Sequence, residues 1–227
     1  MARAKHVLSM EARGFQTVAK EPLDSAALAQ NASCVAGAPG EHVLAVRESV
    51  PLVEDVVFTN KVSQNLHAEL LLRQLSTLAM GADCAGSIVE GARVVRTFLT
   101  KQVGIDKDDF VFFDGSGLSG HDLVTPRATA RLLQFTAGQT WFADWKKSLP
   151  VGGEDGTLAS RFPKAPLAGR VFAKTGTLGE ARALSGYLDC ASGKTVIFSI
   201  MVDNHAPGSS ADTKVMDRIV AAIAAAN

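Results

Sequence analysis

Three β-prone runs near the C-terminal end most constrain how this chain can fold. The first covers residues 170–176 and ends at Gly176, and the other two, residues 183–190 and 194–202, flank the turn signal Ser192-Gly193. Such a turn predicts a hairpin, so we expect an antiparallel sheet. The run from Thr195 to Val202 is apolar on both faces, and we expect it to lie inside a sheet that is covered on both sides.

Apolar residues at helical spacing predict helices before and after this sheet. We expect one helix over residues 60–80 and a second over residues 87–102, stopped by Gly104. A third begins at Thr125-Pro126, because threonine caps helices and proline suits the first helical position, and runs toward Gly138. A closing helix is expected over residues 211–226, and short strands and loops before about residue 50. This order predicts an α+β fold.

Composition narrows the class of partner. Lys and Arg together number 23, and so do Asp and Glu, so nothing favours nucleic acid or an anionic membrane surface. No apolar run approaches the roughly 18 residues that a membrane-spanning helix needs. The three cysteines, Cys34, Cys84 and Cys190, form no close pair and are interpreted as buried or unreactive thiols. A small or polymeric substrate is therefore the expected partner.

The triplet Lys174-Thr175-Gly176, followed by Thr177, is the first candidate site. A lysine at a strand end supplies a fixed cation for a substrate carboxylate, Thr175 adds a hydroxyl, and Gly176 lets a ligand backbone approach the strand. Such a triplet also occurs at ordinary strand ends. Its meaning therefore depends on its neighbours.

The loop from Asp114 to Asp122 is the second candidate site and has two interpretations. Gly115-x-Gly117-x-x-Gly120 spells a dinucleotide-binding fingerprint, which would make the chain a dinucleotide-dependent enzyme. That interpretation needs a helix to open at the glycines, whereas Thr125-Pro126 starts the helix later. No zinc motif or P-loop occurs either, and we predict no metal, no nucleotide and no other cofactor.

The sequence Asp114-Gly-Ser-Gly-Leu-Ser119 resembles the class C low-molecular-mass penicillin-binding proteins, whose second motif is Ser-x-Asn. Further similar segments, in the family's order, are residues 60–73, 155–162 and 183–187. The resemblance implies part of a β-lactamase/transpeptidase-like domain with D-alanyl-D-alanine carboxypeptidase or endopeptidase activity. It also implies peptidoglycan stem peptides and β-lactams as ligands and a periplasmic or other extracytoplasmic location.

Carried over to this sequence, the resemblance implies a role for each candidate residue. Ser119 would relay protons near the scissile bond, and Lys174 would anchor the substrate carboxylate. Thr175, Gly176 and Thr177 would bind the peptide along the strand, with the Thr177 N–H in an oxyanion hole. His121 stands where the family has asparagine, and is interpreted either as a ligand contact or as a solvated loop residue.

The family's nucleophile motif is missing from this sequence. Such enzymes attack with the serine of Ser-x-x-Lys, and no serine here has lysine three residues later. We therefore expect a fragment, a truncated gene product or one piece of a cleaved enzyme, inactive alone and partnered by a missing N-terminal segment. Residues 1–50 would be a remnant of an inserted or linking region, and residues 51–227 the C-terminal part of the domain. A β-lactamase and a non-catalytic peptidoglycan-binding remnant are the alternatives.

Overall fold

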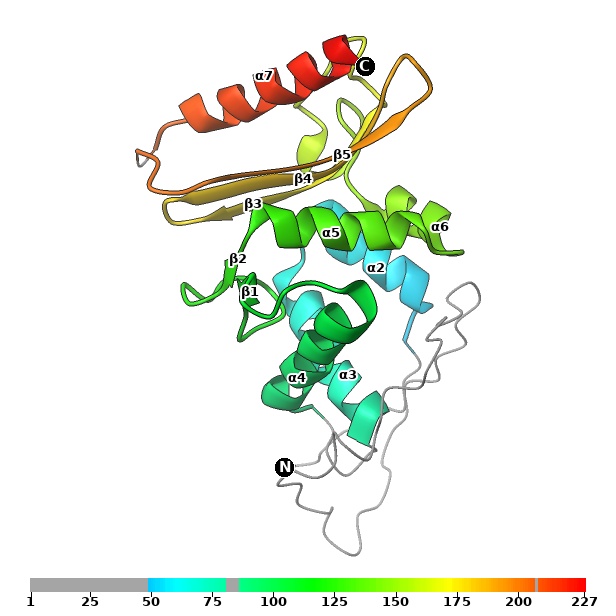
Figure 1. Ribbon diagram of the computed structural model, residues 1–227, viewed down its shortest axis with the longest axis vertical. Coiled ribbons are helices and arrows are strands. Elements are labelled where there is room, and N and C mark those ends of the chain that lie inside the picture. The colour runs from blue at the N-terminus through cyan, green and yellow to red at the C-terminus, as the bar shows by residue number, and fades with distance from the viewer. Residues whose placement is uncertain (1–48, 81–85, 207) are drawn as a thin grey trace, which may run out of the picture.

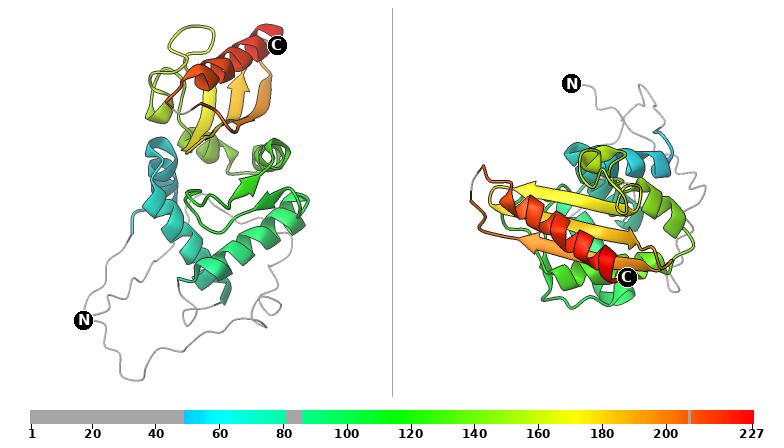
Figure 2. Two further views of the ribbon diagram at one scale, coloured as in Figure 1. Left: turned by 90° about the vertical axis from the view of Figure 1, so that its left-hand side faces the viewer. Right: turned by 90° about the horizontal axis from the view of Figure 1, so that it is seen from above.

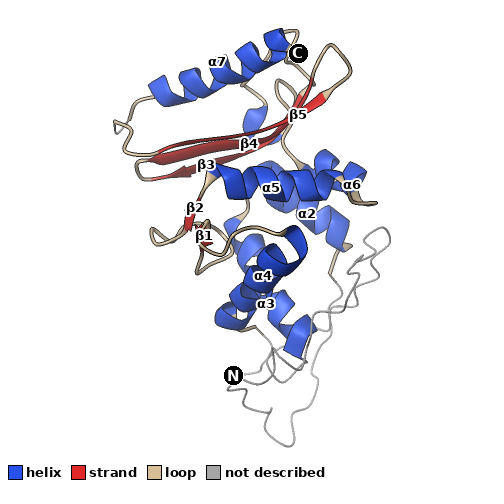
Figure 3. Ribbon diagram, viewed as in Figure 1, coloured by secondary structure: helices blue, strands red, loops and turns tan. Residues whose placement is uncertain are grey.

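The computed structural model describes residues 49–80, 86–206 and 208–227, and it confirms the α+β class (Figure 1). Helices and strands are coloured separately in Figure 3. The α-helices are α2 (Leu52–Val62), α3 (Asn65–Met80), α4 (Ile88–Phe98), α5 (Pro126–Ala137), α6 (Phe142–Ser148) and α7 (Ala211–Ala226). The strands are β1 (Phe110–Val111), β2 (Leu123–Val124), β3 (Val171–Leu178), β4 (Ala181–Asp189) and β5 (Thr195–Val202). A π-helical turn, Leu99–Val103, follows α4, and a 3₁₀ turn, Gly156–Leu158, precedes β3.

The main sheet has the order β3-β4-β5 and is antiparallel throughout, as predicted. A two-residue turn joins β3 to β4, and its first residue, Gly179, has φ of 50°, which glycine adopts without steric cost. β5 is covered on both faces but lies at an edge of this sheet within the described residues, not in its interior as the apolar run predicted.

The sheet lies between α7 on one side and α5 and α6 on the other (Figure 2), and alternate residues of its strands face these two layers. One face packs under α7, where Val171, Ala173, Leu184, Met216 and Val220 are among the members of a buried cluster. The opposite face packs on α5 and α6 through the buried ring of Tyr187, together with Phe172, Ile197, Leu133, Leu149 and Trp145. Even-numbered residues of β3 face this second layer, and this parity decides where the Lys174 side chain points.

The hydroxyl of Tyr187 ties the sheet to α5 and α6. It donates to the Leu133 carbonyl oxygen at 2.9 Å, contacts the Thr136 hydroxyl, and accepts from Trp145 Nε1 at 3.3 Å. We expect Tyr187→Phe to lower the free energy of unfolding by about 1–2 kcal/mol, because buried polar partners lose a hydrogen bond without gaining water. Urea unfolding measures this, and a loss below about 0.3 kcal/mol would contradict the role given to the hydroxyl.

The expected helix over residues 60–80 is instead two helices with a break between them. α2 ends at Val62, and Ser63 adopts a left-handed conformation with φ of 59° before α3 begins at Asn65. The prediction was wrong here because the apolar period of α3 runs almost unbroken into that of α2. The break matters because it turns the Ser63 side chain out of both helices.

Other local expectations are confirmed. The Thr125 hydroxyl accepts from the Ala128 N–H and caps α5, with Pro126 at its first position, and α4 and α7 begin within one residue of the predicted starts. α6 lies in a stretch for which the sequence predicted no helix. Cys190 is buried, whereas Cys34, Cys84 and the expected strands before residue 49 lie outside the described residues. Among the described helices, none is both long enough and apolar enough to cross a bilayer.

Candidate functional site

Lys174 lies on β3 and projects toward the helical layer of the molecule. Its Nζ donates a hydrogen bond to the Ser63 hydroxyl at 2.7 Å and another to the Thr175 carbonyl oxygen at 3.0 Å. Burial lowers the pKa of the Lys174 ammonium below its ordinary value of 10.5, because the charged form loses hydration. The structure thus holds a partly desolvated cation against a serine hydroxyl that is 111 residues away in sequence.

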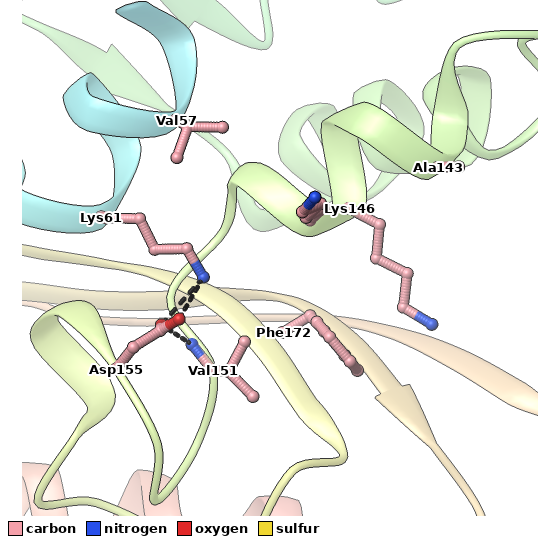
Figure 4. A pocket seen from close by; sticks show the side chains of 8 residues that line it. Val57, Lys61, Ala143, Lys146, Val151, Asp155 and Phe172 are labelled. Carbon is pink, nitrogen blue, oxygen red and sulfur yellow. Dashed lines mark hydrogen bonds and ion pairs between the residues drawn. The ribbon is translucent and has the colours of Figure 1, made fainter. Parts of the chain in front are cut away.

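Ser63 is positioned by Lys61, which anchors the end of α2. The Lys61 ammonium donates to the Leu149 carbonyl oxygen at 2.6 Å and to both carboxylate oxygens of Asp155, at 2.8 and 2.7 Å. Asp155 in turn accepts from the Val151 N–H at 2.8 Å. A hollow between α2, α6 and β3 is lined by Lys61, Asp155 and Val151, together with Val57, Ala143, Lys146, Lys147 and Phe172 (Figure 4). Phe172, which lines this hollow, lies two residues before Lys174 on the same face of β3.

Ser63-Gln64-Asn65 is itself a Ser-x-Asn triplet, and it is not among the residues predicted for the site from the sequence. Asn65 opens α3 with an exposed side chain, two residues after the hydroxyl that meets Lys174. The signal was present in the triplet and in the similarity of residues 60–73 to the family. The triplet was not recognised from the sequence because the loop from Asp114 to Ser119 also resembles the family's second motif. A continuous helix was also expected over residues 60–80.

The edge of β3 beyond Ala173 carries the remaining residues of the motif. The Gly152 N–H donates to the Val171 carbonyl at 2.8 Å, and the Ala173 N–H to the Pro150 carbonyl at 3.0 Å. Backbone groups of odd-numbered residues therefore point away from β4, so Thr175 and Thr177 present theirs at the outer edge. The Thr175 hydroxyl donates to Thr157 Oγ1 at 2.8 Å, and Gly176 and Thr177 are exposed.

Ser119 and His121 lie in the hairpin loop between β1 and β2, where their described contacts stay local. The Ser119 N–H donates to Asp114 Oδ2 at 2.7 Å, and the His121 N–H donates to the Ser119 hydroxyl at 3.2 Å. The exposed His121 ring meets Phe113 edge-on, with 6.3 Å between ring centroids. Among the hydrogen bonds of the described residues, the serine hydroxyl on Lys174 is that of Ser63, and none joins Ser119 to Lys174.

The first residues of the loop between β1 and β2 are tied to α3. Glu69 Oε1 accepts from the backbone N–H groups of Gly115 and Ser116 at 3.0 and 3.2 Å. The Phe113 N–H donates to Asp122 at 2.8 Å, and burial raises the pKa of the Asp122 carboxyl. The loop therefore braces α3, the helix that Asn65 opens, and no helix starts at its glycines as a dinucleotide site requires.

The sheet, its covering helices and the two motifs together define a class of protein. An antiparallel sheet between a C-terminal helix and a helical layer, with Lys-Thr-Gly on the edge strand and Ser-x-Asn at a helix junction, belongs to the penicillin-recognising transpeptidase-like fold. The chain belongs to the D-Ala-D-Ala carboxypeptidase 3 (S13) family, whose sequence model matches residues 24–226.

Relatives support this membership. The chain is 36% identical over 188 residues to the D-alanyl-D-alanine carboxypeptidase of Actinomadura sp. strain R39, covering 81% of this chain and 34% of that protein. It is 30% identical over 169 residues to the D-alanyl-D-alanine carboxypeptidase DacB of Haemophilus influenzae, covering 74% of this chain and 35% of that protein. The chain thus spans about a third of the length of these relatives.

Solved structures agree with the fold. The crystal structure of penicillin binding protein 4 (dacB) from Haemophilus influenzae matches with a TM-score of 0.70 and 28% identity, covering 77% of this chain and 40% of that chain. The same protein has been solved in complex with a β-lactam. A predatory endopeptidase of Bdellovibrio bacteriovorus matches with a TM-score of 0.59 at 23% identity and shares the fold.

Proposed function

We propose that this chain supplies the substrate-binding half of a serine-type D-alanyl-D-alanine carboxypeptidase or endopeptidase that acts on peptidoglycan peptides outside the cytoplasm. The observation that carries the proposal is the 2.7 Å hydrogen bond between Lys174 Nζ and the Ser63 hydroxyl. It joins the Lys-Thr-Gly strand to a Ser-x-Asn triplet, and each triplet lies on the kind of element that such chemistry requires.

The residues take distinct roles in this proposal. Lys174 and the Thr175 hydroxyl bind the terminal carboxylate of a D-Ala-D-Ala peptide or of a penicillin. The ligand backbone lies along the outer edge of β3 beside Gly176, and the Thr177 N–H donates to the carbonyl under attack. Asn65 takes the amide contact first assigned to His121. Ser63 takes the proton relay first assigned to Ser119, because its hydroxyl is the one that meets Lys174.

The chemistry is acyl transfer through a serine ester. A serine from a Ser-x-x-Lys segment attacks the penultimate D-Ala carbonyl, and the peptide bond breaks to release D-Ala, which takes up a proton. Water then hydrolyses the ester. No serine of this chain stands in Ser-x-x-Lys, so the proposal makes the chain inactive by itself and complete only with a segment that supplies this motif.

Labelling with a fluorescent penicillin tests the proposal. The isolated chain is expected to take up no covalent label. A chimaera, in which the N-terminal part of the Haemophilus influenzae relative precedes this chain, is expected to label stably, because the family pattern places Ser-x-x-Lys in that part. Labelling is followed by denaturing gel and mass spectrometry, and covalent labelling of the isolated chain would overturn the assignment of the nucleophile.

Two alternatives give different results in the same experiment. A β-lactamase would turn the penicillin over, so product would accumulate while the label was lost within minutes. A non-catalytic peptidoglycan-binding remnant would bind a D-Ala-D-Ala peptide reversibly but leave the chimaera unlabelled. Stable labelling of the chimaera with slow loss of label distinguishes the carboxypeptidase from both.

A further inference from the structure

The turn between β3 and β4 is tied to α7 by an ion pair between Arg182, whose side chain is 21% exposed, and the largely buried Asp212. Arg182 lies directly opposite Thr177 in the sheet register, so both side chains point to the α7 face. The Arg182 Nε lies 3.1 Å from Asp212 Oδ2, and Nη1 donates to the Thr213 hydroxyl at 2.7 Å. Asp212 is in the first turn of α7, and its side chain is 6% exposed. The end of the hairpin is therefore tied to the start of the closing helix.

His205, in the connection between β5 and α7, closes the same cluster. Its side chain is also 6% exposed, and its Nδ1 lies 3.9 Å from Asp212 Oδ2. Its backbone N–H donates to the Glu180 carbonyl oxygen at 3.2 Å, which holds the tip of the turn. Two points of the hairpin, Glu180 and Arg182, are thus fixed to one buried carboxylate and its neighbours.

The cluster is not built for maximal stability. Withdrawing a carboxylate from water costs desolvation that the attraction of its ion pair only partly offsets, so such a pair is a weak stabiliser compared with apolar packing. Asp212 Oδ2, Arg182 Nε and His205 Nε2 are buried atoms without a hydrogen-bond partner among the described residues, and the first two meet only as an ion pair. What the cluster does provide is a tie between the β3–β4 turn and the start of α7.

We propose that Arg182, Asp212 and His205 are positioning residues that set the end of β3 so that the Thr177 N–H points at the ligand carbonyl. The inference rests on the proposed function for the role of Thr177 and goes beyond it in naming what orients that group. Lys174 lies three residues earlier on β3, opposite Ser185, and is held separately by its contact with Ser63. Thr177, which recognises the ligand carbonyl, therefore depends on the Arg182 cluster. Lys174, which recognises the ligand carboxylate, depends on Ser63.

Amide hydrogen exchange in the unliganded chain tests the geometry without any ligand. The Gly176 and Leu178 amides pair with β4 near the turn, and Phe172 pairs with Tyr187 at the far end. In Asp212→Asn, exchange at Gly176 and Leu178 is expected to speed up about tenfold relative to Phe172, as local opening near the turn becomes easier. Asp212→Glu, which keeps the charge, is expected to restore most of the protection.

Asp217→Asn is the matched control. Asp217 is on α7, as Asp212 is, and its substitution removes the ion pair with Arg161 of the loop before β3, with side-chain exposures of 31% and 16%. Neither residue belongs to the β3–β4 hairpin. The ratio of Gly176 to Phe172 exchange is expected to stay unchanged in this variant. An unchanged ratio in Asp212→Asn, or an equal change in Asp217→Asn, would overturn the proposal.

Acylation kinetics of the chimaera provide the functional readout. In Asp212→Asn, the rate constant for acylation from the bound complex is expected to fall about tenfold or more, since a misdirected oxyanion donor loses transition-state stabilisation. The constant for reversible penicillin binding is expected to change less than about threefold, because Lys174 keeps its place. An equal fall in the acylation rate constant and in the affinity for penicillin would contradict a specific effect on Thr177. If the unmodified chimaera does not react, the proposed function fails, and exchange alone decides whether the cluster orients β3.

Discussion

Lys174→Met is expected to slow penicillin acylation of the chimaera about 100-fold. The charge-assisted hydrogen bonds that Lys174 offers to a ligand carboxylate are each worth roughly 1.5–3 kcal/mol, and methionine keeps an unbranched side chain, one atom shorter, while removing them. The second-order rate constant, followed by quenched-flow labelling with a fluorescent penicillin, measures the loss. Most of the effect should appear in reversible binding of the ligand.

Lys194→Met is the matched control, because Lys194 is exposed in the turn between β4 and β5, away from the Ser63 contact. This variant is expected to acylate at the rate of the unmodified chimaera. Removing Lys174 should not unfold the protein, since burial already disfavours its charged form. An unchanged acylation rate in Lys174→Met, with the fold intact by circular dichroism, would remove Lys174 from the site.

The lowered pKa of Lys174 also predicts how binding depends on pH. Carboxylate binding needs the protonated ammonium, so affinity is expected to fall as pH rises through the lowered pKa, below the ordinary lysine value of 10.5. The stability of the free protein depends on pH in the opposite direction. The unfolded chain holds this proton more tightly, so the contribution of Lys174 to the free energy of unfolding rises with pH between the folded pKa and 10.5.

Gly186→Ala is expected to cost about 3 kcal/mol or more of stability, or to prevent folding. Gly186 is in the central strand β4, and an added Cβ would lie 2.1 Å from the Phe172 carbonyl oxygen and 2.6 Å from the Ala173 Cα. These are backbone atoms of β3, so relief requires the two strands to separate beside Lys174. Chemical unfolding, or the yield of soluble protein, measures the loss, and a change below about 1 kcal/mol would contradict this packing.

Gly176→Ala provides the contrast on the neighbouring strand. An added Cβ there would meet only the Ala183 Cβ at 3.4 Å among atoms outside its immediate neighbours, apart from a backbone nitrogen at 4.0 Å. Stability is therefore expected to stay within about 0.5 kcal/mol, or to rise, because alanine restricts the unfolded chain. The same methyl group faces the side where a ligand backbone is proposed to lie, so acylation of the chimaera is expected to fall.

Much of the fold follows from short-range patterns. The three strands, the capped start of α5 and the closing helix were predictable because alternation, turn residues and caps act over a few positions. The break at Ser63 was not, because a single residue in the left-handed region leaves no apolar signature. α6 was missed because its seven residues are too few to establish a helical period. The edge position of β5 depends on which strands pair, which its own sequence does not encode.

The candidate site was predictable in part. Lys174 and its strand came from the triplet and its local context, whereas the partner hydroxyl depended on a contact across 111 residues. The loop with Ser119 resembles the family strongly, but that likeness alone could not assign a role to its serine. In the structure the loop braces α3 through Glu69. These two contacts support the helix that Asn65 opens.

The central claim is that Ser63, rather than Ser119, shares the substrate site with Lys174. The acylation rate of the chimaera by a fluorescent penicillin, compared between Ser63→Ala and Ser119→Ala, tests it most directly. We expect Ser63→Ala to lower the rate about 100-fold, as loss of a proton relay does, and Ser119→Ala to change it less than about threefold. A large loss in Ser119→Ala with an unaffected Ser63→Ala would contradict the claim.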